Sequence, residues 1–172
     1  MKIIVILFLV IINTPAYSQV HERWDVKTIT DNFSPDFNSI RKITVAKIEP
    51  KPKIRVQNTQ PRLNFEKQMV SISGTVSRIA LESDGDYHIE ITDGTMGDSS
   101  FVCEAVNPSL SVASGSKMVS HFKTVYKTAK NLKVGNNVEF TGILFQDKFH
   151  NPSPNRTRNF VEMHPILIAA KR

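Results

Sequence analysis

The sequence predicts a mostly β domain built around a small closed barrel, and three observations lead to this expectation. Alternating apolar residues mark five strand-like runs, at 70–81, 87–91, 101–106, 136–146 and 160–170. One run with helical spacing, at 114–132, falls between the third and the fourth of them. Gly74 and Gly142 interrupt the first and fourth runs, as expected where a barrel strand bends sharply. This order of elements, with one α-helix between strands three and four, is that of the OB-fold, a five-stranded Greek-key barrel.

The first residues have the pattern of a secretory signal peptide. Lys2 precedes an apolar run, Ile3–Ile12, and the small residues Ala16 and Ser18 stand three and one positions before the expected cut. The apolar run is too short to span a bilayer, and no other run is long enough for a membrane span. We therefore expect residues 1–18 to be removed near Ser18 and the rest to be exported, to the periplasm or to the outside of the cell.

Residues 19–69 predict an N-terminal strap ahead of the barrel domain, 70–172. Three prolines stand among basic residues, at Pro50, Pro52 and Pro61. Proline fixes φ and lacks a backbone donor, so an extended chain is expected here instead of a helix. Trp24, the only tryptophan, is expected to anchor the strap on the barrel.

The first strand is expected to bend. Its apolar residues are even-numbered from Val70 to Val76 and odd-numbered from Ile79 onward. A slip of one residue reverses the two faces of a strand. The change of phase therefore predicts a β-bulge or a sharp bend near Gly74–Arg78.

The turn after this strand can be chosen by testing registers. A two-residue turn at 84–85 would set polar His88 opposite apolar Leu81. A three-residue loop at 83–85 sets Tyr87 opposite Leu81 instead, so that apolar side chains share one face. It also places Gly85 at the last loop position, which has a left-handed backbone.

The same counting predicts a register for the second and third strands. If Thr92 pairs with Ser100, then His88 lies opposite Glu104 on the outer face of the barrel. Cys103, the only cysteine, then points inward as a buried thiol and leaves no internal disulfide. In OB-folds the exposed side of these two strands, flanked by the 1–2 and 4–5 loops, is the usual ligand surface.

The last elements follow from spacing and from proline. Met118, Phe122, Val125 and Ala129 form an apolar stripe along the expected helix. Pro165 lies inside the fifth strand and implies an edge or a bulge there, because proline cannot donate a ladder hydrogen bond.

Imidazole and carboxylate groups make up the candidate site. Such groups can ligate Zn²⁺ or Mn²⁺, or act as a general acid and base. We consider as catalytic candidates His88, Glu104 and His164, and as metal ligands His88, Glu104 and His150. The wider set of candidate ligand-binding residues comprises Asp86, His88, Glu104, Lys148, His150, Arg156 and Arg158. No dense motif such as H-E-x-x-H occurs, and a cross-strand hydrogen bond between His88 and Glu104 explains the same pair structurally.

Several motifs resemble an uncharacterised family of secreted bacterial OB-fold-like proteins. They are "RWDVKTITD" at 23–31, "ESDGDYHIEITD" at 82–93, a glutamate before a proline-containing loop, "TGILFQDKFH" at 141–150 and "VEMHP" at 161–165. The sequence departs from the family's pattern in "CEAVNP" and at Met163, where Ile or Leu is usual. The resemblance implies the fold and export, without an assigned reaction. The positions that match the family's motifs are Trp24, Lys27, Thr28, Asp31, Asp86, His88, Glu104, His150, Glu162, His164 and Pro165.

These patterns favour a monomeric binding module over an enzyme. Its ligand stays open among an oligosaccharide, a nucleic acid and a protein, and a divalent metal is the only cofactor considered. The net charge of +6 allows nucleic acid, but the predicted outer face of the second strand is acidic and lacks aromatic residues for base stacking. The alternative is a metal-dependent hydrolase, nuclease included. No G-x-S-x-G, P-loop or G-x-G-x-x-G motif occurs.

Overall fold

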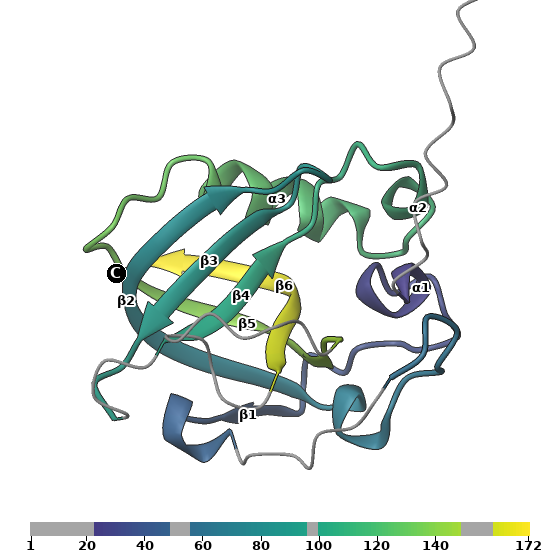
Figure 1. Ribbon diagram of the computed structural model, residues 1–172, viewed down its shortest axis with the longest axis horizontal. Helices are drawn as coiled ribbons and strands as arrows, with labels where there is room; N and C mark the ends of the chain where they lie inside the picture. Colours follow the sequence, from purple (N-terminus) through teal and green to yellow (C-terminus); the bar gives the residue numbers. More distant parts are fainter. Residues whose placement is uncertain (1–22, 49–55, 96–99, 149–159) are drawn as a thin grey trace, which may run out of the picture.

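The computed structural model describes residues 23–48, 56–95, 100–148 and 160–172, and it confirms the predicted barrel (Figure 1). Its five strands are β2 (Met69–Leu81), β3 (Tyr87–Thr92), β4 (Phe101–Ala105), β5 (Asn137–Gln146) and β6 (Val161–Lys171). They follow one another around the barrel in the order β2-β3-β4-β6-β5, and β5 pairs with β2 to close it. β4 and β6 run parallel, and the other barrel pairs are antiparallel. This is the Greek-key order of an OB-fold.

The long strand β2 takes part in both halves of the barrel. It pairs with β5 over Met69–Thr75 and with β3 over Thr75–Leu81. The register with β3 shifts between Val76 and Arg78, which confirms the predicted bulge. The bend lets one strand close the barrel, and the irregularity reverses which residues face the interior.

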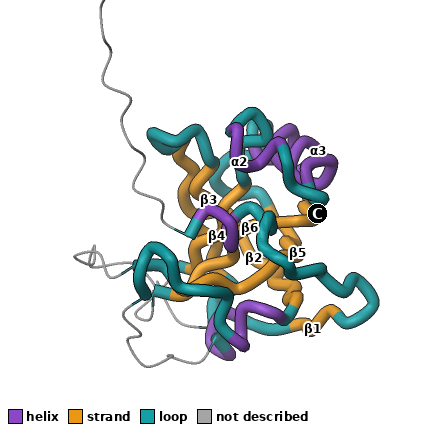
Figure 2. The backbone as a smooth tube through the Cα atoms, turned by 90° about the vertical axis from the view of Figure 1, so that its right-hand side faces the viewer, coloured by secondary structure: helices purple, strands orange, loops and turns teal. Residues whose placement is uncertain are grey.

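Helices close one end of the barrel. The expected helix is α3 (Val119–Ala129), shorter than the predicted run 114–132, and a short helix, α2 (Ser111–Ser114), precedes it; the two lie together at the end away from β1 (Figure 2). Val125 and Ala129 of α3 pack into the barrel core, whereas Phe122 joins a second core outside it. No helix among the described residues is long and apolar enough to cross a bilayer.

The hairpin between β2 and β3 has the predicted register. Leu81 pairs with Tyr87, Ile79 with Ile89 and Arg78 with Glu90. Gly85 has a φ of 87°, and the hydroxyl of Tyr126 on α3 donates to its carbonyl oxygen at 2.9 Å. The hairpin loop therefore rests directly on the helix that covers the barrel end.

Replacing Gly85 by alanine is expected to lower the free energy of unfolding by about 1–2 kcal/mol, because a Cβ disfavours the left-handed backbone. The added Cβ would also displace the side-chain amide of Asn107, which is the group nearest to it. Gly135→Ala is the matched control, since its φ is 88° and nothing lies within 4 Å of an added Cβ. Urea denaturation should show that Gly85→Ala is destabilised by at least as much as Gly135→Ala. An unchanged midpoint for Gly85→Ala would contradict the assigned loop.

The described residues of the N-terminal segment, 23–48 and 56–68, are not wholly extended as the sequence suggested. They contain α1 (Trp24–Lys27), β1 (Ile40–Lys42) and two short 3-10 turns, η1 (Val45–Lys47) and η2 (Asn64–Lys67). β1 pairs in parallel with the beginning of β2 and so adds a sixth strand beside the barrel. Further apolar residues of the segment pack on the outside of the barrel at Met69, Ile143 and Leu167.

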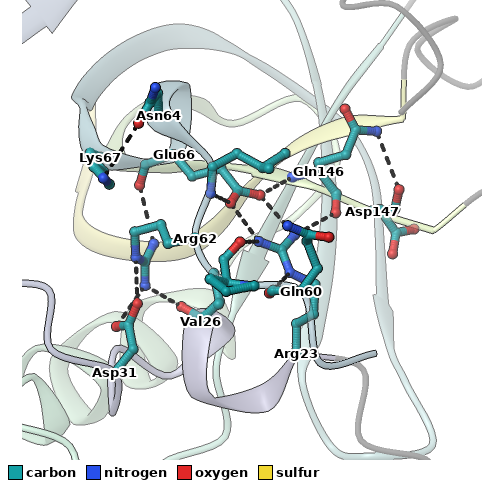
Figure 3. A network of polar contacts seen from close by, with 12 residues as sticks. Arg23, Val26, Asp31, Gln60, Arg62, Asn64, Glu66, Lys67, Gln146 and Asp147 are labelled. Carbon is teal, nitrogen blue, oxygen red and sulfur yellow. Dashed lines mark hydrogen bonds and ion pairs between the residues drawn. The ribbon is translucent and has the colours of Figure 1, made fainter. Parts of the chain in front are cut away.

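Polar contacts anchor the beginning of this segment (Figure 3). The guanidinium of Arg23 donates to both carboxylate oxygens of Glu66, at 2.9 and 2.6 Å, and to the carbonyl of Gln146 at 3.1 Å. Arg62 binds Asp31 in the same two-pronged manner, at 2.8 and 3.1 Å. Bidentate contacts of this kind fix orientation as well as distance. They hold α1 in place against the end of β5.

Candidate functional site

Five ionisable side chains, four from three neighbouring strands and one from the loop before β3, meet on the outer side of the barrel; we call them the His–carboxylate cluster. They are Asp86, His88, Glu104, Glu162 and His164. The predicted pairing of His88 with Glu104 is confirmed across β3 and β4. Cys103 pairs with Met163 in the parallel ladder, which brings Glu104 next to His164 on β6.

The face that carries the cluster is buried, whereas we expected it to be exposed. His88 is 3% exposed, Glu104 is 7% exposed, and Asp86 and His164 are fully buried. α1 provides part of the cover, because the Lys27 ammonium lies 5.3 Å from the centre of the Phe145 ring. That ring in turn lies 5.7 Å from the ring of His164. The N-terminal segment thus covers part of the usual OB-fold ligand surface.

Glu104 connects the two imidazole rings. Its Oε1 lies 3.1 Å from Nδ1 of His88, and its Oε2 lies 2.9 Å from Nδ1 of His164. Nδ1 of His164 also lies 3.2 Å from Oε1 of Glu162. On the other side of the same ring, Nε2 lies 3.5 Å from Oδ2 of Asp86. The ring of His164 therefore has carboxylates at both of its nitrogens.

The His88 end of the cluster reaches solvent. Nδ1 of His88 lies 3.4 Å from Oε1 of Glu82, whose side chain is 42% exposed. Nε2 lies 3.4 Å from Oε1 of Glu90. Glu90 also accepts hydrogen bonds from Arg78 at 3.0 Å and from the Ser100 hydroxyl at 2.7 Å. This end is a partly open, carboxylate-rich surface, whereas the His164 end is closed.

Burial affects the acidity of the carboxylates unequally. Burial raises the pKa of Asp86 to about 7, although the charge of His164 opposes this shift. Burial and the charge of Glu104 raise the pKa of Glu162 to about 7. Burial also acts on Glu104, but its contacts with His164 and His88 prevail and hold the pKa of Glu104 well below its usual range. Glu104 is thus the carboxylate that stays charged.

The carboxylates around the two histidines raise the pKa of both rings. Burial and the charge of Lys27 lower the pKa of His164, yet the contacts with Glu104 and Glu162 outweigh them and raise it to about 10. The pKa of His88 is also raised, because Glu104 and Glu82 outweigh its burial. At neutral pH the Glu104–His164 contact is therefore an ion pair.

Two groups within this region have donor atoms close enough to share a metal ion. One consists of Glu82, His88 and Glu104, and the other of Asp86, Glu104 and His164. In each group the donor atoms all lie within 4.8 Å of one another. Imidazole nitrogen with carboxylate oxygen suits Zn²⁺ and Mn²⁺.

The structure brings together His88, Glu104, His164 and Asp86 of the predicted residues. Lys148 is half-buried just after β5. His150, Arg156 and Arg158 lie outside the described residues. Neither Glu162 nor Lys27 was among the candidate site residues. The signal for Glu162 was available, since it stands two positions before His164 and a strand returns to the same face every second residue.

The comparisons with known proteins show the fold. No family model matches the chain, and no curated protein matches it. A Leishmania major protein described as an aspartyl-tRNA synthetase matches with a TM-score of 0.50 and 13% identity. That match covers 80% of this chain and 22% of the synthetase, so this chain spans about a fifth of that protein.

Two further solved structures resemble the chain more loosely. OBody AM3L09, solved bound to hen egg-white lysozyme, has a TM-score of 0.45 and 12% identity, covering 63% of this chain and 84% of that one. The Stn1–Ten1 complex of S. pombe has a TM-score of 0.39 and 12% identity, and the match covers 60% of this chain and 57% of that one. At such identities the likeness extends to the OB-fold alone.

Proposed function

We propose that the chain is an exported OB-fold module that binds its ligand at the open, His88 end of the outer face. The observation that carries this proposal is the placement of this end on β3 and β4, the strands through which OB-folds bind ligands. Export rests on the signal-peptide pattern of residues 1–18, which lie outside the described residues.

The chemistry of this end favours ligands that donate hydrogen bonds. Glu82 and Glu90 present carboxylates here, and Arg78, with a side chain 56% exposed, already pairs with Glu90. A phosphate backbone would meet these carboxylates and be repelled, whereas sugar hydroxyls or amines would be accepted. A donor-bearing oligosaccharide or polypeptide fits this surface better than a nucleic acid does.

Direct titration tests the proposal. We expect the full mature chain to bind chitohexaose or oligolysine in calorimetric titrations and to bind single-stranded DNA weakly or not at all at low salt. Glu82→Gln should weaken the observed binding by about 5- to 10-fold, the effect of losing roughly 1–1.4 kcal/mol from one charged hydrogen bond.

Glu139→Gln is the control, because it removes a carboxylate from β5, which borders β2 and β6 instead of β3 and β4. Binding should be the same in this variant as in the unmodified chain. If none of the three probes binds, the binding-module proposal fails. If DNA binds and Glu82→Gln strengthens its binding, the expected ligand chemistry is wrong.

A further inference from the structure

We propose that Asp86, Glu104 and His164 form an internal site for a divalent transition-metal ion such as Zn²⁺ or Mn²⁺. The site is the closed end of the His–carboxylate cluster, and it goes beyond the ligand surface proposed at the open end. Its three residues are all buried and come from three different segments of the barrel: the loop before β3, strand β4 and strand β6.

Two buried polar atoms point to a ligand between them. Within the part of the chain that the structure describes, neither Oδ2 of Asp86 nor Nε2 of His164 has a hydrogen-bond partner. Such atoms are costly to bury, because they have lost water and gained nothing in exchange. They face each other at 3.5 Å.

The separation of these two atoms suits joint coordination better than direct bonding. A charge-assisted hydrogen bond would draw nitrogen and oxygen to about 2.7–2.9 Å. Metal bonds of about 2.0–2.1 Å, meeting at a tetrahedral angle, hold the two ligand atoms roughly 3.4 Å apart. The 3.5 Å observed between Nε2 and Oδ2 agrees with the second arrangement.

The neighbouring groups are placed as the supporting residues of a metal site are. The carboxylate of Glu162 lies 3.2 Å from Nδ1 of His164, which orients the ring so that Nε2 is the ligand atom. Oε2 of Glu104 lies 2.9 Å from the same Nδ1 atom, so Glu104 also orients the ring in this structure, and its carboxylate has to turn to reach an ion at Nε2. Oδ1 of Asp86 accepts the backbone N–H of Asn107 at 2.7 Å, which leaves Oδ2 for the ion.

The balance of charge in this region also favours a cation. Three carboxylates, those of Asp86, Glu104 and Glu162, are buried together around His164, and the positive charges near them are those of the protonated His164 ring and of Lys27. Buried carboxylates are stable only when opposite charge or hydrogen bonds compensate them. A divalent ion provides that compensation and can leave His164 neutral, as a metal ligand has to be.

Metal titration of the tag-free full chain tests this site. After chelator treatment and dialysis, we expect calorimetry with ZnCl₂ to show one tight site per chain, and Co²⁺ to give the visible absorption bands of a low-coordinate ion. Asp86→Asn keeps an oxygen that accepts the backbone N–H of Asn107, and it removes the charged oxygen that would bind the ion. It should weaken Zn²⁺ binding by at least about 10-fold, as removal of a metal-site residue does.

Two variants separate this site from its alternatives. Glu139→Gln should bind Zn²⁺ as the unmodified chain does, and circular dichroism should show that Asp86→Asn remains folded. Absence of Zn²⁺ and Mn²⁺ binding in the folded chain would overturn the proposal. So would loss of binding in His88→Gln with full binding in Asp86→Asn, which would place the ion at Glu82, His88 and Glu104 instead. Because these titrations use the ion alone, they are independent of whether an organic ligand binds.

Discussion

Replacing Glu66 by alanine is expected to lower the free energy of unfolding by about 3–5 kcal/mol, because it leaves a buried charge without its partner. The side chains of Arg23 and Glu66 are 1% and 0% exposed and lie 2.6 Å apart. Glu66 also accepts the backbone N–H groups of Leu63 at 2.6 Å and Gln146 at 2.8 Å. Truncation therefore removes the acceptor of four hydrogen bonds, two from Arg23 and one each from Leu63 and Gln146. Chemical denaturation followed by tryptophan fluorescence measures the loss, since Trp24 lies next to Arg23.

An exposed ion pair is the matched control for this prediction. Arg172 contacts Glu139 at the surface, and the side chain of Arg172 is 60% exposed. Arg172→Ala should cost no more than about 1 kcal/mol, as is usual for exposed pairs. Replacing both Arg23 and Glu66 by apolar residues should cost less than Glu66→Ala alone, because no buried charge then remains. A loss below about 1 kcal/mol in Glu66→Ala would show that the anchor contributes little.

Replacing Gly142 by alanine is the second change with a large expected effect. An added Cβ would lie 2.8 Å from Cγ and 2.9 Å from Sδ of Met163, and it would also meet the carbonyl oxygen of Pro165. Overpacking of this kind costs about 1–3 kcal/mol, and a backbone oxygen cannot move aside as a side chain can. We expect a loss at or above the upper end of that range, measured as a shift of the urea midpoint.

Gly115→Ala separates this steric effect from a general effect of adding a methyl group. Nothing lies within 4 Å of a Cβ at Gly115, and its φ is −84°, so the variant should be close to the unmodified chain in stability. If Gly142→Ala denatures at the same urea concentration as Gly115→Ala, then β5 and β6 do not approach each other as closely as described.

The barrel could be predicted because its strands obey simple local rules. Alternation, the change of phase before Ile79 and the turn glycine Gly85 fixed the hairpin register without knowledge of any distant contact. The N-terminal segment gave no such pattern. The position of α1 depends on Arg23, whose partners Glu66 and Gln146 are far away in the sequence. Contacts of that kind leave no periodic signal.

The site could be predicted only in part, because register counting finds neighbours across strands but does not show what covers them. Register counting placed His88 opposite Glu104, as the structure shows, and the parallel neighbour His164 was named without a geometric reason. Burial of the face was missed, because polar residues on alternate strand positions ordinarily indicate solvent. Only the tertiary placement of α1 over Phe145 shows that these polar groups are enclosed and must satisfy one another.

The hydrogen bond from Arg23 to the carbonyl of Gln146 joins residues 123 positions apart. Contacts that close so long a loop carry a high entropic cost until the intervening chain is ordered. We therefore expect strands β2 to β5 to assemble before α1 docks. On this expectation the His–carboxylate cluster is enclosed late in folding, and until then its imidazole and carboxylate groups are accessible to water and to ions.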